Sequence, residues 1–249
     1  MTAKSTRLLR ALKEEKAKRQ QARQSLLAFT EYTFPEYQAA DHHKLIARTL
    51  EAVEAGKIDR LMVTMPPRHG KSELVTKRFP AWWLGLHPRG QVITASYNSD
   101  LARDFGRSVR NIVNGRRYAN VFQTRLAADS QAADRWNTNQ DGAYVAAGVG
   151  TAVTGRGADL LIIDDPLKDR AEADSELKRD TIYDWYTSTA YTRLMPGGSV
   201  IVVQTRWHED DLAGRLLERE EDGGDSWFKL DLPAINTDGD ALWPSRYGL

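Results

Sequence analysis

The sequence predicts an α/β fold with a mostly parallel central β-sheet flanked by helices. Short apolar runs alternate with helical stretches, as in chains whose parallel strands are joined by crossover helices. Residues 160–163 and 200–203 are wholly aliphatic, which is typical of strands covered on both faces. At 249 residues the chain suits one large domain with an appendage.

The individual elements follow from the same patterns. We expect strands at residues 61–65, 92–96, 160–164 and 200–204. We expect helices at residues 44–55, 72–84, 101–114, 175–194 and 210–221. Asp41 is the expected N-cap of the first helix, and the second is expected to kink or end near Pro80. The glycine-rich residues 137–154 are expected to form a hairpin or a long loop of β character.

The first 30 residues form a predicted basic helical arm. Residues 4–23 are dense in lysine and arginine, with two glutamates opposing them. Leu8, Leu9 and Leu12 give a narrow apolar stripe at helical spacing. Two interpretations stay open: a solvated, partly frayed helix whose leucines dock on the body, or an arm that contacts a neighbouring subunit or DNA phosphates.

Composition excludes several classes of protein. The chain has no cysteine, which excludes disulfides, thiolate zinc sites and cysteine nucleophiles. No apolar run approaches the length of a membrane-spanning helix, so we expect no membrane contact. The formal net charge of +1 argues against a uniformly basic DNA-coating protein, and any contact with nucleic acid must be a local patch.

The most informative stretch is MPPRHGKS at residues 65–72. It follows a short apolar strand and opens a helical pattern, which is the context of a nucleoside triphosphate cradle. Gly70 lets the backbone approach the phosphates, Lys71 supplies a charge for the β- and γ-phosphates, and the Ser72 hydroxyl can bind Mg²⁺. The predicted nucleotide-binding residues are Pro67, Arg68, His69, Gly70, Lys71 and Ser72.

The loop departs from the usual G-x-x-x-x-G-K-[ST] pattern. Met65 stands where the first glycine would fall, Pro66 and Pro67 stiffen the turn, and Arg68 adds a second cation. The alternative interpretation is a chance glycine-lysine-serine in a basic loop. The strand before it and the helix after it favour nucleotide binding.

A carboxylate pair, Asp164 and Asp165, ends the aliphatic strand at 160–164. In a phosphate-loop enzyme the first carboxylate holds the Mg²⁺ shell and the second orients and deprotonates the attacking water. The alternative is an Asp-Asp-Pro turn that only terminates the strand. Its position after an aliphatic strand and downstream of the phosphate loop favours the catalytic interpretation.

Three further polar residues complete the predicted site. Gln204 ends the strand at 200–204 and Thr205 follows it, where a polar side chain can sense the γ-phosphate. Arg156 lies between two glycines, which suits a cation that projects toward the charge developing on the γ-phosphoryl group. The alternative for Arg156 is a glycine turn with a solvated arginine. Residues 208–211 could also be interpreted as a metal site, but acidic residues are expected anyway in a first helical turn.

Taken together, these motifs resemble the large subunit of the DNA-packaging terminases of tailed bacteriophages. The resemblance extends from about Phe34 onward and is carried by RLMVTMPPRHGKSE, RFPAWWLG, ITASYNSDLARDFGRSVR, GVGTAVTGRGADLLIIDDPLKDRAEADS, WYTSTAYTRL and VVQTRWHEDDLAGRLL. It implies an additional-strand, RecA-like P-loop ATPase that uses ATP and Mg²⁺. It also implies a homo-oligomeric ring at the portal vertex of the procapsid in the host cell cytoplasm, with double-stranded DNA, the portal protein and the small terminase subunit as partners.

The resemblance also implies roles for single residues. Arg68 belongs to the phosphate loop and to the catalytic set, Asp164 and Ser72 to the metal site, and Thr205 to the coupling motif. The catalytic carboxylate after the metal ligand is commonly glutamate in this family. Here it is Asp165, with Glu172 as the alternative. Arg156 resembles a finger that acts on the neighbouring subunit.

The domain expectations follow the family pattern. Residues 31–240 are expected to be the motor domain and residues 241–249 the start of a linker to a ribonuclease-H-like nuclease domain that this chain lacks, so no nuclease activity is expected. A helicase-like, DNA-stimulated P-loop ATPase is the alternative function, but it needs a second sheet domain. A binding module with a decayed site would lack Lys71, Ser72 or Asp164, and all three are present.

Overall fold

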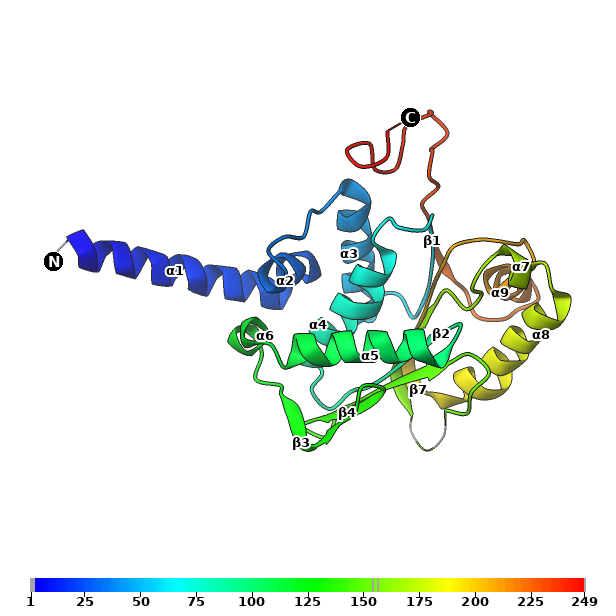
Figure 1. The fold of residues 1–249 in the computed structure, drawn as a ribbon, viewed down its shortest axis with the longest axis horizontal. Helices are drawn as coiled ribbons and strands as arrows, with labels where there is room; N and C mark the ends of the chain where they lie inside the picture. Colours follow the sequence, from blue (N-terminus) through cyan, green and yellow to red (C-terminus); the bar gives the residue numbers. More distant parts are fainter. Residues whose placement is uncertain (1–2, 154, 156, 249) are drawn as a thin grey trace.

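The computed structural model describes residues 3–153, 155 and 157–248, and these form an α/β fold around a single large sheet (Figure 1). The strand order is β3-β4-β5-β2-β6-β7-β1-β8. The strands are β1 Arg60–Thr64, β2 Gln91–Ser96, β3 Leu126–Gln131, β4 Arg135–Thr138, β5 Ala143–Gly148, β6 Ala158–Asp164, β7 Leu194–Gln204 and β8 Phe228–Asp231. Only the pairs β3–β4 and β4–β5 are antiparallel among these strands, so the predicted mostly parallel sheet is confirmed.

Helices cover both faces of the sheet. Figure 1 shows α3 to α6 on one side and α7 to α9 on the other. The helices are α1 Ala3–Gln24, α2 Leu26–Thr33, α3 Asp41–Glu54, α4 Phe79–Leu86, α5 Ser99–Val113, α6 Arg116–Val121, α7 Arg170–Ala173, α8 Glu176–Trp185 and α9 Leu212–Glu221. The π-helical segments are η1 Glu73–Arg78 and η2 Tyr186–Ala190, and η3 Tyr191–Arg193 is a 3₁₀ turn.

The central strands divide their side chains between two hydrophobic cores. Leu160 and Ile162 point into the core under α3, α4 and α5, whereas Leu161 and Ile163 point into the core under α8 and α9. Successive residues of a strand face opposite sides of the sheet, so an unbroken aliphatic run is required where both sides are covered. The buried carboxyl-terminal halves of β6 and β7 therefore hold that edge of the sheet rigidly.

The prediction of a helix at residues 72–84 that kinks or ends near Pro80 is wrong in detail. The chain first makes the wide π-helical turn η1 and then α4, in which Pro80 lies in the first turn. Proline has no N–H and its ring clashes with the carbonyl four residues earlier, so it is tolerated at a helix start and not inside one. Pro80 therefore begins a helix rather than ending one.

At two other helices, one expectation is corrected and one of two open interpretations is excluded. Ala40, not Asp41, is the N-cap of α3, and the Ala40 N–H is bound by the His43 side chain instead. On α1 the stripe leucines do not dock on the body, because Leu8, Leu9 and Leu12 are 62%, 46% and 58% exposed. Figure 1 shows the amino half of α1 projecting from the rest of the molecule.

The β-structure is more extensive than predicted. The hairpin expected within residues 137–154 is confirmed as the antiparallel pair β4–β5, but β3 and β8 were missed. Both lie at the edges of the sheet and are polar and largely exposed, so they lack the aliphatic signal that marked the central strands. β7 also begins six residues before the predicted start at 200.

Candidate active site

Three neighbouring strands bring the predicted site together at one edge of the sheet. β7 lies between β1 and β6 and is parallel to both. Thr64 is level with Gln204, and Asp164 is level with Val203. The phosphate loop, the second aspartate and Thr205 therefore leave the same carboxyl edge, and β7 is the strand inserted between the two phosphate-site strands.

Lys71 is the centre of this cluster. Its side chain is only 6% exposed, and its Nζ lies 2.7 Å from Asp165 Oδ2 and 2.5 Å from Thr205 Oγ1. Asp165 Oδ1 also accepts the backbone N–H of Thr205 at 2.8 Å. Residues from three separate loops thus form one hydrogen-bonded unit, and a buried ammonium is stable there because a carboxylate neutralises it.

Asp164 sits deeper and is only partly satisfied. It is 1% exposed, and its Oδ2 accepts a hydrogen bond from Thr76 Oγ1 at 2.6 Å. Its Oδ1 is buried and has no hydrogen-bond partner among the described residues. Burial and then the charge of Asp165 raise the pKa of Asp164, while the hydroxyls of Thr76 and Ser72 oppose that rise.

The donor set at Asp164 fits a magnesium ion. An unpartnered buried carboxylate oxygen is costly unless something binds it, and Mg²⁺ prefers carboxylate and hydroxyl oxygens. Asp164 and Ser72 are the residues that would hold the ion. Thr76 was missed in the sequence, although it lies four residues after Ser72 and so on the same helical face.

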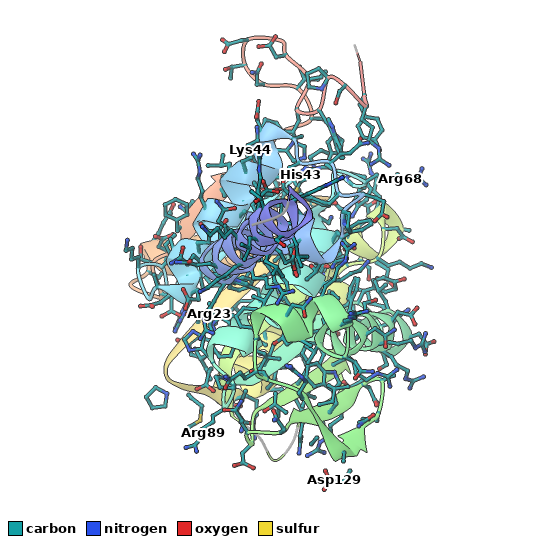
Figure 2. All side chains as sticks on the ribbon, turned by 90° about the vertical axis from the view of Figure 1, so that its left-hand side faces the viewer. Arg23, His43, Lys44, Arg68, Arg89 and Asp129 are labelled. Carbon is teal, nitrogen blue, oxygen red and sulfur yellow. The ribbon has the colours of Figure 1, made fainter. Side chains whose placement is uncertain are left out.

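The phosphate loop has an unusual backbone. Arg68 has φ 63° and Gly70 has φ 85°, and the left-handed conformation is unfavourable for a residue with a Cβ. The Arg68 side chain is exposed and points away from the body (Figure 2). The imidazole of His69 is buried, and its Nδ1 lies 2.9 Å from the carbonyl of Pro67. Neither Arg68 nor the His69 ring contacts Lys71 by a hydrogen bond in this structure.

The two candidate water-activating carboxylates have different surroundings. Asp165 contacts Lys71, as described above. Glu172 Oε2 accepts the backbone N–H of Lys168, and the Glu172 N–H is capped by Asp169 at the start of α7. Glu172 therefore has a local structural role, and the assignment of Asp165 to water activation stays a prediction.

Arg156 lies outside the described residues. The described Gly157 directly precedes Ala158, the first residue of β6, whereas Asp164 is the last. Seven residues at about 3.3 Å each make a strand of roughly 20 Å. The described start of β6 at Ala158 is therefore one strand length from the phosphate site, and the finger role of Arg156 stays a prediction.

The acidic run at residues 208–211 is structural. Asp210 accepts hydrogen bonds from Arg215 and Arg179, which hold the pKa of Asp210 well below its usual range. Asp211 caps α9 and pairs with Arg206. Among the described residues, no group of three or more histidine and acidic side chains is arranged to hold a metal ion.

Residues 62–245 match the family model of the terminase large subunit, T4-like virus type, N-terminal part. The chain belongs to this family. The match covers most of the chain and begins inside β1, so it includes the phosphate loop, the aspartate pair and Thr205. The resemblance inferred from the motifs is therefore confirmed.

Solved structures agree on the fold of this terminase domain. The HK97 bacteriophage large terminase has a TM-score of 0.52 and 12% identity over 82% of this chain and 41% of its own. The ATPase domain of the Thermus phage P74-26 large terminase has a TM-score of 0.52 and 14% identity over 88% of this chain and 87% of its own. The comparison with curated proteins found no match.

These findings confirm the predicted α/β fold with its mostly parallel sheet and the assignment to the N-terminal part of a terminase large subunit. This chain spans about two fifths of the length of the HK97 protein, so activities of a whole terminase are proposals for it. Within the described residues, no helix is both long and apolar enough to cross a membrane.

Proposed function

We propose that this terminase domain hydrolyses ATP to drive double-stranded DNA into a procapsid. The observation that carries the proposal is the unit of Lys71, Asp165 and Thr205 beside the unpartnered oxygen of Asp164. In the assembled state we propose a homo-oligomeric ring on the portal protein, supplied with DNA by the small subunit, at the portal vertex in the host cytoplasm. Family membership supports these partners.

The chemistry begins with an exchange at Lys71. In this structure the ammonium is neutralised by Asp165. The β- and γ-phosphates of ATP carry more negative charge than one carboxylate, so they compete for the same ammonium. When Lys71 turns to the phosphates, Asp165 loses its strongest partner and becomes free to accept a proton from a water molecule. Nucleotide binding thereby switches on the base.

Asp164 and Ser72 have a separate task. They would hold Mg²⁺, which when bound neutralises charge on the β- and γ-phosphate oxygens. Asp164 is fixed for this by Thr76 and by its place at the end of a buried strand. Because Asp165 sits on the next peptide unit at φ 43°, the two carboxylates are aimed at different atoms.

Thr205 connects the site to the rest of the sheet. Its side chain contacts Lys71 and its backbone N–H contacts Asp165, so movement of either group would displace the end of β7. We propose that this contact couples the state of the nucleotide to movement of the domain. The proposed ligands of the site are therefore ATP and Mg²⁺, with Arg68 exposed at its rim.

Two assays on the wild-type chain test the proposal. ATP turnover is measured with and without duplex DNA, and strand separation is measured in the same mixtures. A packaging motor should turn over ATP faster with duplex DNA and leave the strands paired. Strand separation that requires ATP would instead indicate a helicase-like enzyme. DNA binding without any ATP turnover would indicate a binding module without catalysis.

A further inference from the structure

We propose that His43, supported by His42, is a positioning residue that holds the phosphate loop in its nucleotide-binding shape. Both histidines lie at the start of α3 and act through one backbone carbonyl, that of His69. The inference rests on the proposed nucleotide binding at Lys71.

The contacts are short and buried. His43 Nε2 lies 2.9 Å and His42 Nε2 3.1 Å from the carbonyl oxygen of His69. The two rings are 1% and 3% exposed. A carbonyl oxygen has two lone pairs, so one oxygen can accept from both imidazoles. Figure 2 shows His43 and Arg68 in the same upper part of the molecule.

The tautomer of His43 follows from its second contact. Nδ1 of His43 accepts the backbone N–H of Ala40 at 3.0 Å, so Nδ1 carries no proton. A neutral imidazole has its one proton on the other nitrogen, and Nε2 therefore donates to His69. Burial lowers the pKa of His43 to about 4, so the neutral form that makes both contacts is present at pH 7.

Holding this carbonyl orients the next N–H. The peptide unit is planar and trans, so its C=O and N–H point in opposite directions. With the His69 carbonyl directed at α3, the Gly70 N–H is directed away from the histidines. Backbone N–H groups at this position are those that face phosphate in a P-loop. The histidine pair therefore presets one phosphate donor before nucleotide arrives.

Two further observations support a built contact. A Cβ on Gly70 would lie 2.4 Å from His43 Nε2, so the ring occupies the space that a side chain would need. On the other side, Trp243 packs edge-on against both rings, with centroid distances of 5.2 Å to His42 and 4.8 Å to His43. The loop and the rings are thus held from opposite sides in a dry environment.

The C-terminal segment reaches the same loop. The ring of Tyr247 lies 4.7 Å from that of His69, and its hydroxyl donates to the carbonyl of Arg68 at 3.3 Å. Arg246 lies over Trp243 at 4.9 Å. This packing holds the rings in place, whereas the carbonyl of His69 is contacted by the two histidines, which makes the proposal testable.

The two contacts of His43 can be separated by substitution. In His43→Gln the amide nitrogen replaces Nε2 and keeps a donor for the His69 carbonyl, whereas the acceptor for Ala40 is lost. In His43→Asn the amide oxygen replaces Nδ1 and keeps the acceptor for Ala40, whereas the donor to the loop is lost. A positioning role and a role in helix capping therefore predict opposite rankings of the two variants.

The experiment measures the Kd for adenylyl imidodiphosphate with Mg²⁺ and the denaturant unfolding midpoint of each variant. We expect His43→Asn to raise Kd by about 3- to 10-fold, which corresponds to one lost hydrogen bond, and His43→Gln to stay within about twofold of wild type. We expect the unfolding midpoint to fall more in His43→Gln. His87→Asn is the matched control, because that ring bonds Glu54 and should leave Kd unchanged.

A second variant covers the case in which position 43 does not tolerate change. His42→Phe keeps an aromatic ring against Trp243 and removes the second donor, so Kd should rise by a smaller factor. If His43→Asn binds as tightly as wild type, or if Kd follows the loss of stability in every variant, the histidines are structural only and the proposal is overturned. If wild type binds no nucleotide, or if Lys71→Ala binds as well as wild type, the proposed function itself fails.

Discussion

Lys71 shows how a single residue is kept ready for an anionic ligand. Its ammonium is buried, which is unfavourable for an isolated charge, and its partners Asp165 and Thr205 compensate. Both partners are groups that the proposed reaction needs. The same contacts that stabilise the free protein therefore position the catalytic groups, and phosphate binding must break at least one of them.

The two aspartates should be separable by amide substitution. Asp164→Asn should weaken Mg²⁺-dependent nucleotide binding, because the unpartnered oxygen is the proposed metal ligand. Asp165→Asn should retain binding and slow hydrolysis by roughly 10²- to 10⁴-fold, the usual contribution of a general base. Equilibrium binding and phosphate release measure the two effects. Equal binding by both variants, together with a block in Glu172→Gln alone, would show that the carboxylate roles are misassigned.

Stability without nucleotide should depend on pH through Asp164. Its pKa is raised in the folded state, so the folded protein binds a proton more readily than the unfolded chain does. The free energy of unfolding should therefore fall as pH rises from the unfolded pKa through the folded one. Asp164→Asn should remove this dependence and be more stable than wild type at pH 8 in a chelator. If the free energy of unfolding of wild type rises over this pH range and Asp164→Asn removes the rise, the raised pKa of Asp164 is contradicted.

At the scale of elements, β1, β6 and β7 were predictable because burial on both faces demands aliphatic runs. The edge strands β3 and β8 were not, since exposed strands carry no such demand. The π-turn η1 was also missed. A periodicity of apolar residues does not distinguish a π-helical turn from an α-helical one.

For the arm α1, the structure excludes one of the two interpretations of its leucine stripe. Its outer leucines are exposed, while its inner end is anchored by the hydrogen bond that the Tyr32 hydroxyl donates to Glu15 and by buried Ala22. Deleting residues 3–12 should therefore leave the unfolding midpoint unchanged. Denaturation followed by circular dichroism measures this. A drop of several degrees would show that the stripe packs on the body after all.

The same deletion should weaken DNA binding in a salt-dependent way. Each lysine or arginine that leaves a phosphate should reduce the slope of log K against log salt by about 0.9. On α5, Arg103 and Arg107 are already paired with Asp100 and Asp104, so their replacement by glutamine should change the slope less. Affinity insensitive to salt, or strongly dependent on base sequence, would count against a motor that grips phosphates.

At the scale of the whole molecule, the sequence allowed the loops of the site to be predicted, but not their contacts. Lys71 and Asp165 are 94 residues apart, and only the placement of β7 between β1 and β6 brings them together. The histidine contact with the loop was missed for a related reason. It depends on which way two rings and one carbonyl point, and sequence spacing does not encode that.

Cooperation between subunits is expected to run through Arg156. Arg156 lies between two glycines, and its resemblance to the family's finger leads us to expect that it serves a neighbouring subunit. Arg156→Ala should bind ATP normally and fail to hydrolyse it, with a loss of about 10³- to 10⁵-fold as for other arginine fingers. Mixing it with Lys71→Ala should restore part of the activity. No restoration, with mixed assembly demonstrated, would place Arg156 outside the neighbouring site.

Phosphate release from ATP, measured for wild type and Lys71→Ala over a range of protein concentrations, tests the site most directly. Wild type should turn over ATP at a rate per subunit that rises with concentration, because an assembled neighbour completes the site. Lys71→Ala should keep its fold by circular dichroism and lose nearly all turnover, since it loses charge compensation at the phosphates. Equal turnover in the two proteins would contradict the assignment of this cluster as the ATPase site.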